Sequence, residues 1–219
     1  MTFRRWVLPA AAVVIATAGC APEAPDYQAI LSTTPTTTTT TSTEVPEPLS
    51  AYLENLGVTG APVAPDKLTD LTVSVPTPPG WAPYTNPNLA PGTRVNAKGD
   101  TYPTAMLLVF QLEGDFDVKD ALKHADGDAE LSENFKRLNG SEDNFRGFPS
   151  SMVEGTYDLN GQRMQSYNRV VVATGTPARQ NLPGQKYLIQ LTVTGFADKA
   201  QAQGPDIEAI IRGFQVRAR

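Results

Sequence analysis

The sequence contains one cysteine, Cys20, and the residues around it indicate a chemical role for its thiol. Thr17, Ala18 and Gly19 stand before it, so small residues occupy the two positions ahead of the cysteine. A diacylglycerol on the sulfur and an acyl chain on the freed α-amino group would make Cys20 a lipid anchor. Two or more chains bind a membrane stably, whereas one chain binds it marginally. We therefore predict an anchor at Cys20 and signal cleavage between Gly19 and Cys20.

Residues 1–19 have the pattern of a secretory signal peptide. Arg4 and Arg5 form a basic start, and residues 6–18 are apolar or small. A membrane-spanning helix needs roughly 20 apolar residues, which this segment does not reach. Residues 17–20 resemble the bacterial lipobox, except at the first position, where Leu or Val is commoner. We expect the mature protein to be exported and held by lipid on the outer face of the cell membrane.

Residues 20–65 are predicted to be the lipidated cysteine followed by a flexible tether. The segment is rich in Thr and Pro up to residue 48 and poor in apolar side chains, so burial cannot offset the entropy of ordering it. As a flexible coil it would span roughly 35–40 Å, enough to lift a domain away from lipid headgroups. O-glycosylation of the Thr run is a further hypothesis.

Residues 66–219 are predicted to form one globular domain of the α+β class, with an antiparallel sheet and helices. Alternating or apolar runs indicate strands at 71–75, 105–112 and 185–196. Asn160-Gly161 is a strong hairpin signal between strands at 151–160 and 162–174. Helical patterns occur at 49–58 (Leu49, Leu53, Leu56) and at 118–125, where the apolar stripe is interrupted at Gly127 and is followed by Leu131, Phe135 and Leu138. A last helical pattern lies around Ile207–Phe214, where Pro205 fits the first turn and Gly213 the end.

Charge and composition exclude several classes of function. Two of the 18 basic residues lie in the signal peptide, so the mature chain carries 16 basic and 23 acidic residues and a net charge of −7. This charge argues against nucleic acid and against electrostatic adhesion to anionic lipids. The single cysteine excludes an internal disulfide, and one histidine, His124, cannot build a zinc cluster. No G-x-S-x-G motif accompanies His124, which argues against a Ser-His-Asp triad. We expect no metal, no cofactor and no catalytic residue.

Two acidic sets are candidate sites. Residues 126–130 superficially match a calcium loop, but Leu131 and Arg137 stand where the EF-hand needs Gly and Glu, so calcium is not expected. Glu113, Asp115, Glu154 and Asp158 lie near strands, and no spacing selects a catalytic pair among them.

Aromatic residues gather in two predicted loops. Trp81 and Tyr84 follow the first strand, and Phe145 and Phe148 flank Arg146 in a second loop. Loops on a rigid scaffold often bind ligands, but aromatic side chains also cover the edge of a core. We favour the covering role.

Taken together, the sequence resembles the mycobacterial LpqN/LpqT lipoprotein family over roughly residues 66–217. The residues that carry the resemblance are Cys20, LTVSVPTPPGW (71–81), LEGDFD (112–117), GFPSSMVEGTY (147–157), YLIQLTV (187–193) and DIEAII (206–211). The resemblance implies a PsbP-like α/β/α sandwich, an antiparallel sheet with helices on both faces. It implies no catalytic residues, and only the anchor at Cys20 carries over.

The leading hypothesis is a non-catalytic binding module of the cell envelope. Its partner would be an envelope lipid or glycolipid, or a transporter that exports one. The alternatives are an envelope hydrolase using unidentified carboxylates, and a surface scaffold or adhesin. An apolar cavity of about 300–1,000 Å³ would favour the first, two close carboxylates in a polar pocket the second, and an apolar surface patch the third.

The anchor makes a direct prediction. In cells fed radiolabelled palmitate, Cys20→Ser should lose the label and move from the membrane fraction to the soluble fraction, because the acylated thiol is gone. Ser32→Ala, a change in the same segment, should leave both unchanged. A Cys20→Ser protein that remains labelled and membrane-bound would refute the anchor.

Overall fold

The computed structural model describes residues 45–179 and 182–219. The predicted signal peptide, its cleavage site at Gly19 and Cys20, and the tether up to residue 44 lie outside these residues. The described fold begins at Val45.

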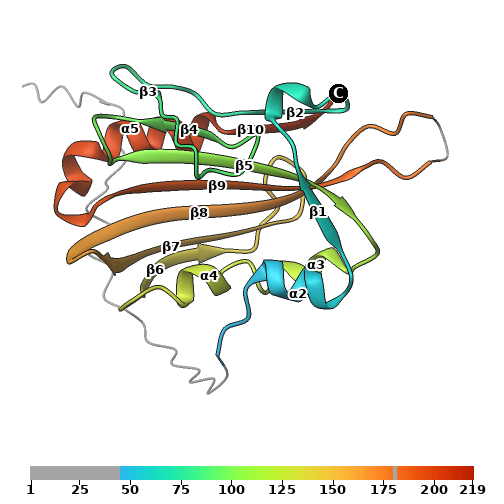
Figure 1. The fold of residues 1–219 in the computed structure, drawn as a ribbon, viewed down its shortest axis with the longest axis horizontal. Coiled ribbons are helices and arrows are strands. Elements are labelled where there is room, and N and C mark those ends of the chain that lie inside the picture. The colour runs from blue at the N-terminus through green and yellow to red at the C-terminus, as the bar shows by residue number, and fades with distance from the viewer. Residues whose placement is uncertain (1–44, 180–181) are drawn as a thin grey trace, which may run out of the picture.

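An antiparallel sheet forms the centre of the molecule (Figure 1). Within the described chain it has eight strands: β1 (Thr59–Pro62), β3 (Ala82–Pro83), β4 (Arg94–Ala97), β5 (Thr104–Glu113), β6 (Lys136–Ser141), β7 (Ser150–Leu159), β8 (Gln162–Thr174) and β9 (Lys186–Phe196). Their order is β3-β4-β5-β9-β8-β7-β6, and β1 shares one edge of β5 with β4. The long strands β5, β9 and β8 therefore lie in the middle.

Helices cover both faces of this sheet. One face carries α5 (Ala200–Gly213) together with a two-stranded sheet of β2 (Leu71–Ser74) and β10 (Gln215–Ala218). The other face carries α2 (Leu49–Asn55), α3 (Val118–Leu122) and α4 (Gly127–Glu130) (Figure 1). Short 3-10 turns, η1 (Pro65–Lys67) and η2 (Ala197–Lys199), precede β2 and α5. The predicted α+β class, an antiparallel sheet flanked by helices, is confirmed.

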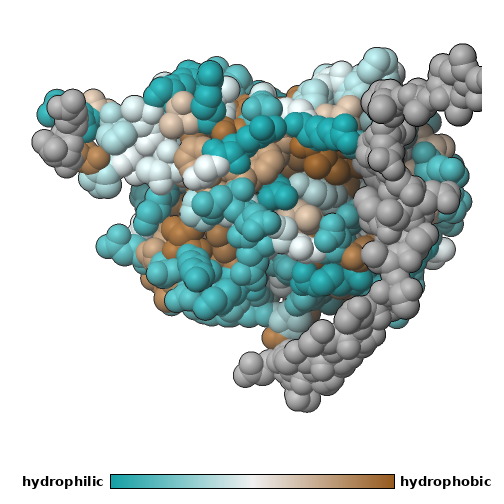
Figure 2. Space-filling model, turned by 180° about the vertical axis from the view of Figure 1, so that it is seen from behind, coloured by the Kyte–Doolittle hydropathy of each residue, from teal (hydrophilic) through white to brown (hydrophobic). Residues whose placement is uncertain are grey.

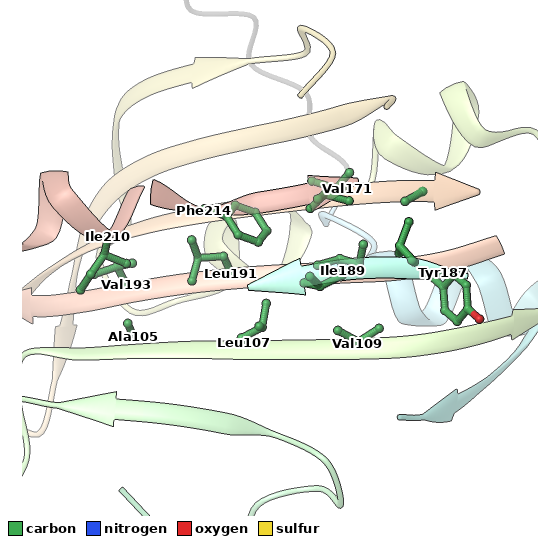
Figure 3. Close-up of a cluster of buried hydrophobic side chains, with 14 of the residues drawn as sticks. Ala105, Leu107, Val109, Val171, Tyr187, Ile189, Leu191, Val193, Ile210 and Phe214 are labelled. Carbon is green, nitrogen blue, oxygen red and sulfur yellow. The ribbon is translucent and has the colours of Figure 1, made fainter. Parts of the chain in front are cut away.

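The main core lies between the sheet and α5. Strand β9 alternates as its sequence predicts, and it buries Tyr187, Ile189, Leu191 and Val193 on the face toward α5. Figure 3 shows these side chains meeting those of β5 and β8, with Ile210 and Phe214 above them. A full burial of one such side chain contributes about 1.5–3 kcal/mol, so this layer supplies much of the stability.

A second core lies under α2, α3 and α4. Leu49 and Leu53 of α2 are each 5% exposed and pack with Val170 and Val172 of β8. Strand β1 extends the sheet along β5. The folded unit thus includes residues before Asp66, where the sequence had placed the end of the tether, because the leucines of α2 find an apolar partner surface.

Two helical expectations differ from the structure. The apolar stripe expected to continue through Leu138 is not helical: α4 ends at Glu130, and residues 136–141 form the edge strand β6, whose backbone pairs with β7. Helix α5 begins at Ala200, so Pro205 lies inside it and not in its first turn. Gly204 permits this, because a Cβ before proline would clash with the proline ring in helical geometry.

The hairpin prediction is confirmed. Strands β7 and β8 pair from Ser150 with Val171 to Leu159 with Gln162. Asn160 and Gly161 have φ of 51° and 74°, the left-handed values that a two-residue hairpin turn requires.

Candidate functional site

A hollow of about 260 Å³ lies between α5 and the sheet. Its floor is formed by side chains of β7, β8 and β9, and its roof by one side of α5. Its lining is mostly apolar and includes Met152, Val193, Phe196, Ile207 and Ile211. A concave, mainly apolar space with a few polar groups is the usual form of a small-molecule site.

The hollow exists because small residues face each other across it. Gly195 of β9 and Gly204 and Ala200 of α5 all line it. A Cβ on Gly195 would lie 2.5 Å from Oε1 of Gln203, so a larger residue at this position would require the side chain of Gln203 to move.

The opposite side of α5 is packed tightly. Ile210 and Phe214 are fully buried, and a Cβ on Gly213 would lie 2.5 Å from Pro76. Asp206 accepts hydrogen bonds from Trp81 Nε1 at 3.0 Å and from Lys98 Nζ at 2.7 Å. These two donors hold the pKa of Asp206 below its usual value, Lys98 having the larger effect. Helix α5 is thus packed against the core along one side and separated from the sheet by the hollow along the other.

Polar groups lie together on the floor of the hollow. Gln165 Nε2 donates to Glu154 Oε1 at 3.2 Å. Burial raises the pKa of Glu154 above its usual value, and this hydrogen bond only partly opposes the effect. Oε1 of Gln203 is buried without a hydrogen-bond partner among the described residues. The floor and the roof of the hollow therefore offer acceptors that are not fully satisfied.

Tyr167 forms the rear wall. Its hydroxyl accepts from Nε of Arg169 at 2.6 Å, while Nη1 of Arg169 donates to Ser150 Oγ at 2.9 Å. The guanidinium of Arg169 also lies over the ring of Phe145, 4.8 Å from its centroid. Burial raises the pKa of Tyr167, so its hydroxyl stays neutral and can donate.

A charged pair lies at the rim. Glu208 and Arg212 of α5 both line the hollow and form an i,i+4 ion pair with each other. Asn139 of β6 lines the hollow as well. An exposed helical ion pair adds little stability, but it neutralises the charge at this point.

A larger hollow of about 830 Å³ lies at the other end of β9. It is open to solvent, and its lining includes Asp70, Asp115, Lys186 and Arg219. Tyr187 donates to Asp70 Oδ1 at 2.8 Å, and burial together with this carboxylate raises the pKa of Tyr187 to about 12. This polar groove lacks the apolar walls of the hollow under α5.

Most of the candidate residues identified from the sequence make ordinary structural contacts. His124 stacks on Tyr52 with ring centroids 4.1 Å apart, and its Nδ1 lies 3.5 Å from Glu47. Asp126 and Glu130, from the segment that superficially matched a calcium loop, both accept from Arg137 at 2.8 Å.

The four candidate carboxylates do not come together. Glu113 at the end of β5 and Asp115 after it are exposed, and Asp158 is bound to Arg163 at the hairpin. Only Glu154 enters the hollow. No group of three or more His, Cys, Asp or Glu suited to a metal occurs among the described residues.

The aromatic residues mainly cover the core, as favoured from the sequence. Phe145 and Phe148 pack against the main core, and Phe145 stacks on Phe214 at 5.0 Å. Trp81 is buried, while Tyr84 is exposed.

Gln165, Gln203 and Gly195 were not identified from the sequence. A signal was present in the core-facing alternation of β9, because Gly195 occupies a position where the pattern calls for a large apolar residue.

Comparisons with known proteins agree on one family. The family model described as "Probable lipoprotein LpqN" matches residues 45–217. The lipoprotein LpqT of Mycobacterium tuberculosis is 56% identical over 216 residues, which cover 96% of this chain and 94% of that protein. LpqT of Mycobacterium leprae is 54% identical over 210 residues, or 94% of each chain.

A solved structure supports the fold. The crystal structure of LpqN, described as involved in cell envelope biogenesis of Mycobacterium tuberculosis, superposes with a TM-score of 0.62 at 19% identity. The match covers 78% of this chain and 97% of LpqN. In the described part of the chain, no helix is both long and apolar enough to cross a membrane.

The burial of Glu154 predicts a pH dependence. The pKa of Glu154 is raised in the folded state. The folded state therefore loses stability relative to the unfolded chain as the pH rises from below 4.5, the usual pKa of this carboxyl, through its pKa in the folded state. Glu154→Gln should therefore gain stability over the wild type between about pH 4 and pH 7, measured by urea unfolding. Glu142→Gln, at an exposed position, should show no such trend. A difference that shrinks with rising pH would contradict the assignment.

Proposed function

We propose a function for this chain on one premise: the chain belongs to the family described as Probable lipoprotein LpqN. It is a non-catalytic, lipid-anchored binding protein of the cell envelope. Its hollow under α5 holds the apolar part of an envelope lipid or glycolipid. The observation that carries this proposal is the hollow itself, with its apolar walls and small polar floor.

The anchor gives the binding site its location. Acylation at Cys20 would confine the domain to the outer face of the membrane, close to the lipids that it binds. LpqN, a relative by fold, is described as involved in cell envelope biogenesis. A role in the envelope fits both the anchor and this relative.

The size of the hollow limits what it can hold. At about 260 Å³ it lies just below the usual range of roughly 300–1,000 Å³ for small-molecule sites. It therefore takes one short apolar segment, such as part of an acyl chain, and leaves the rest of a large lipid outside. Such partial burial suits a protein that presents a lipid to a further partner, for instance a lipid-exporting transporter.

A hydrolase is less well supported. Glu154 and Glu208 both line the hollow, which is the arrangement that a two-carboxylate mechanism needs. Glu208, however, is held by Arg212 at the rim. The remaining lining is largely apolar, which suits retention of a chain better than activation of water.

A scaffold or adhesin would need a broad apolar surface. The exposed large apolar side chains of the described chain lie in five separate segments between or before its helices and strands: Val45, Leu56, Tyr84, Leu131 and Leu182. On the side drawn in Figure 2, hydrophobic residues occur as small patches among hydrophilic ones. This distribution favours a binding site inside the fold.

Filling the hollow should abolish lipid binding. Ala200→Leu places a long side chain into it at only a small loss of helix propensity. Ala202→Leu makes the same change at an exposed position of α5. The three proteins are purified from native membranes, extracted with organic solvent, and their lipids are quantified by mass spectrometry. Wild type and Ala202→Leu should carry stoichiometric lipid, and Ala200→Leu should have lost most of it.

Two results would contradict the proposal. One is the absence of stoichiometric lipid from the wild type, and the other is equal lipid in Ala200→Leu and Ala202→Leu. Urea unfolding of both variants checks that the folded state persists.

A further inference from the structure

We propose that the polar groups lining the hollow select ligands whose polar end donates hydrogen bonds and carries no negative charge. An alcohol or an amine fits this description, and a fatty-acid carboxylate does not. This inference rests on the proposed function, because it names the class of ligand that the same hollow would take.

The roof of the hollow holds an unsatisfied acceptor. Oε1 of Gln203 is buried and has no donor among the described residues. It points at Gly195, close to where a Cβ would stand, and both residues line the hollow. Buried acceptors without a donor are rare and costly in folded proteins. A hydroxyl or ammonium group of a ligand would supply the missing donor.

Further acceptors lie next to this one. Gln165 of β8 pairs directly with Gly195 of β9. Its side chain therefore lies beside Gly195, toward which the side chain of Gln203 also points. Its amide nitrogen donates to Glu154 Oε1. The other carboxylate oxygen of Glu154 has no donor among the hydrogen bonds of the described chain. Acceptors from β7 and α5 thus line the same hollow.

The charge of the lining disfavours an anion. Three of the lining residues have charged side chains: Glu154, Glu208 and Arg212. Glu208 and Arg212 neutralise each other, which leaves Glu154 unbalanced. Arg169 stands behind the wall, engaged by Tyr167 and Ser150, and is not part of the lining. A carboxylate entering the hollow would meet a like charge and would gain no donor from Gln203 Oε1.

The test uses three probes with the same eight-carbon chain: 1-octanol, octylamine and octanoate. Each is titrated at pH 8 by calorimetry into the mature chain, residues 20–219 with Cys20→Ser, which is free of the anchor. Octanol and octylamine should bind on the order of tenfold more tightly than octanoate. Each can donate a hydrogen bond to Oε1 of Gln203, and neither is repelled by the negative charge of Glu154.

Two variants assign the effect to residues. Gln203→Leu should weaken octanol binding by roughly 2- to 10-fold, the loss of one hydrogen bond, and leave octanoate unchanged. Glu154→Gln should raise the affinity for octanoate and narrow the gap between the probes. Ala202→Leu, outside the lining, should behave as the wild type.

The outcomes separate this inference from the proposed function. Equal binding of octanol and octanoate to the wild type, abolished by Ala200→Leu, overturns the selectivity and leaves the lipid-binding function in place. Preference for octanoate also overturns it. Failure of all three probes to bind overturns both proposals.

Discussion

The structure depends on how α5 is held against the sheet. Along one side of this helix, Ile210 and Phe214 fill the core, and Asp206 is tied to Trp81 and Lys98. Those contacts fix the height and the angle of the helix. Along its other side, Ala200 and Gly204 of the helix and Gly195 of the sheet are small, and the neighbouring side chains leave a hollow between helix and sheet.

A hollow in a protein core normally costs stability, since its walls lose van der Waals partners. Here the surrounding frame tolerates it, because the fixed side of α5 prevents the helix from settling onto β8 and β9. The same frame holds Glu154, Gln165 and Gln203 in place. Because the helix above the hollow and the polar groups below it are already held in place, little conformational entropy is lost when a ligand binds.

The sequence revealed the architecture better than it revealed the site. The alternation of β9 and the Asn160-Gly161 turn predicted strands, faces and pairing correctly, since both signals arise from local geometry. The end of the tether was misplaced because the leucines of α2 are too few to predict a stable helix alone, and only their contact with β8 orders them. The stripe through Leu138 was misleading because pairing with β7 overrode a helical spacing.

The site itself could not be predicted, because its parts come from strands and a helix that are distant along the chain. Gln203 and Gly195 meet only when α5 folds back over β9, and neither residue type suggests chemistry by itself. The resemblance to a family of lipoproteins predicted the fold, which the structure confirms, but it carried no ligand-binding residues. The anchor expected at Cys20 stays a prediction. The hollow had to be found in three dimensions.

The most direct test of the central claim is a photo-crosslinking map. Native membranes carrying the protein are given an envelope lipid with a diazirine near the end of its acyl chain, irradiated, and the attached residues are located by mass spectrometry. We predict attachment to residues around the hollow, such as Met152, Val193 and Ile207. Attachment confined to α2, α3 and α4, or to the groove around Tyr187, would contradict lipid binding under α5.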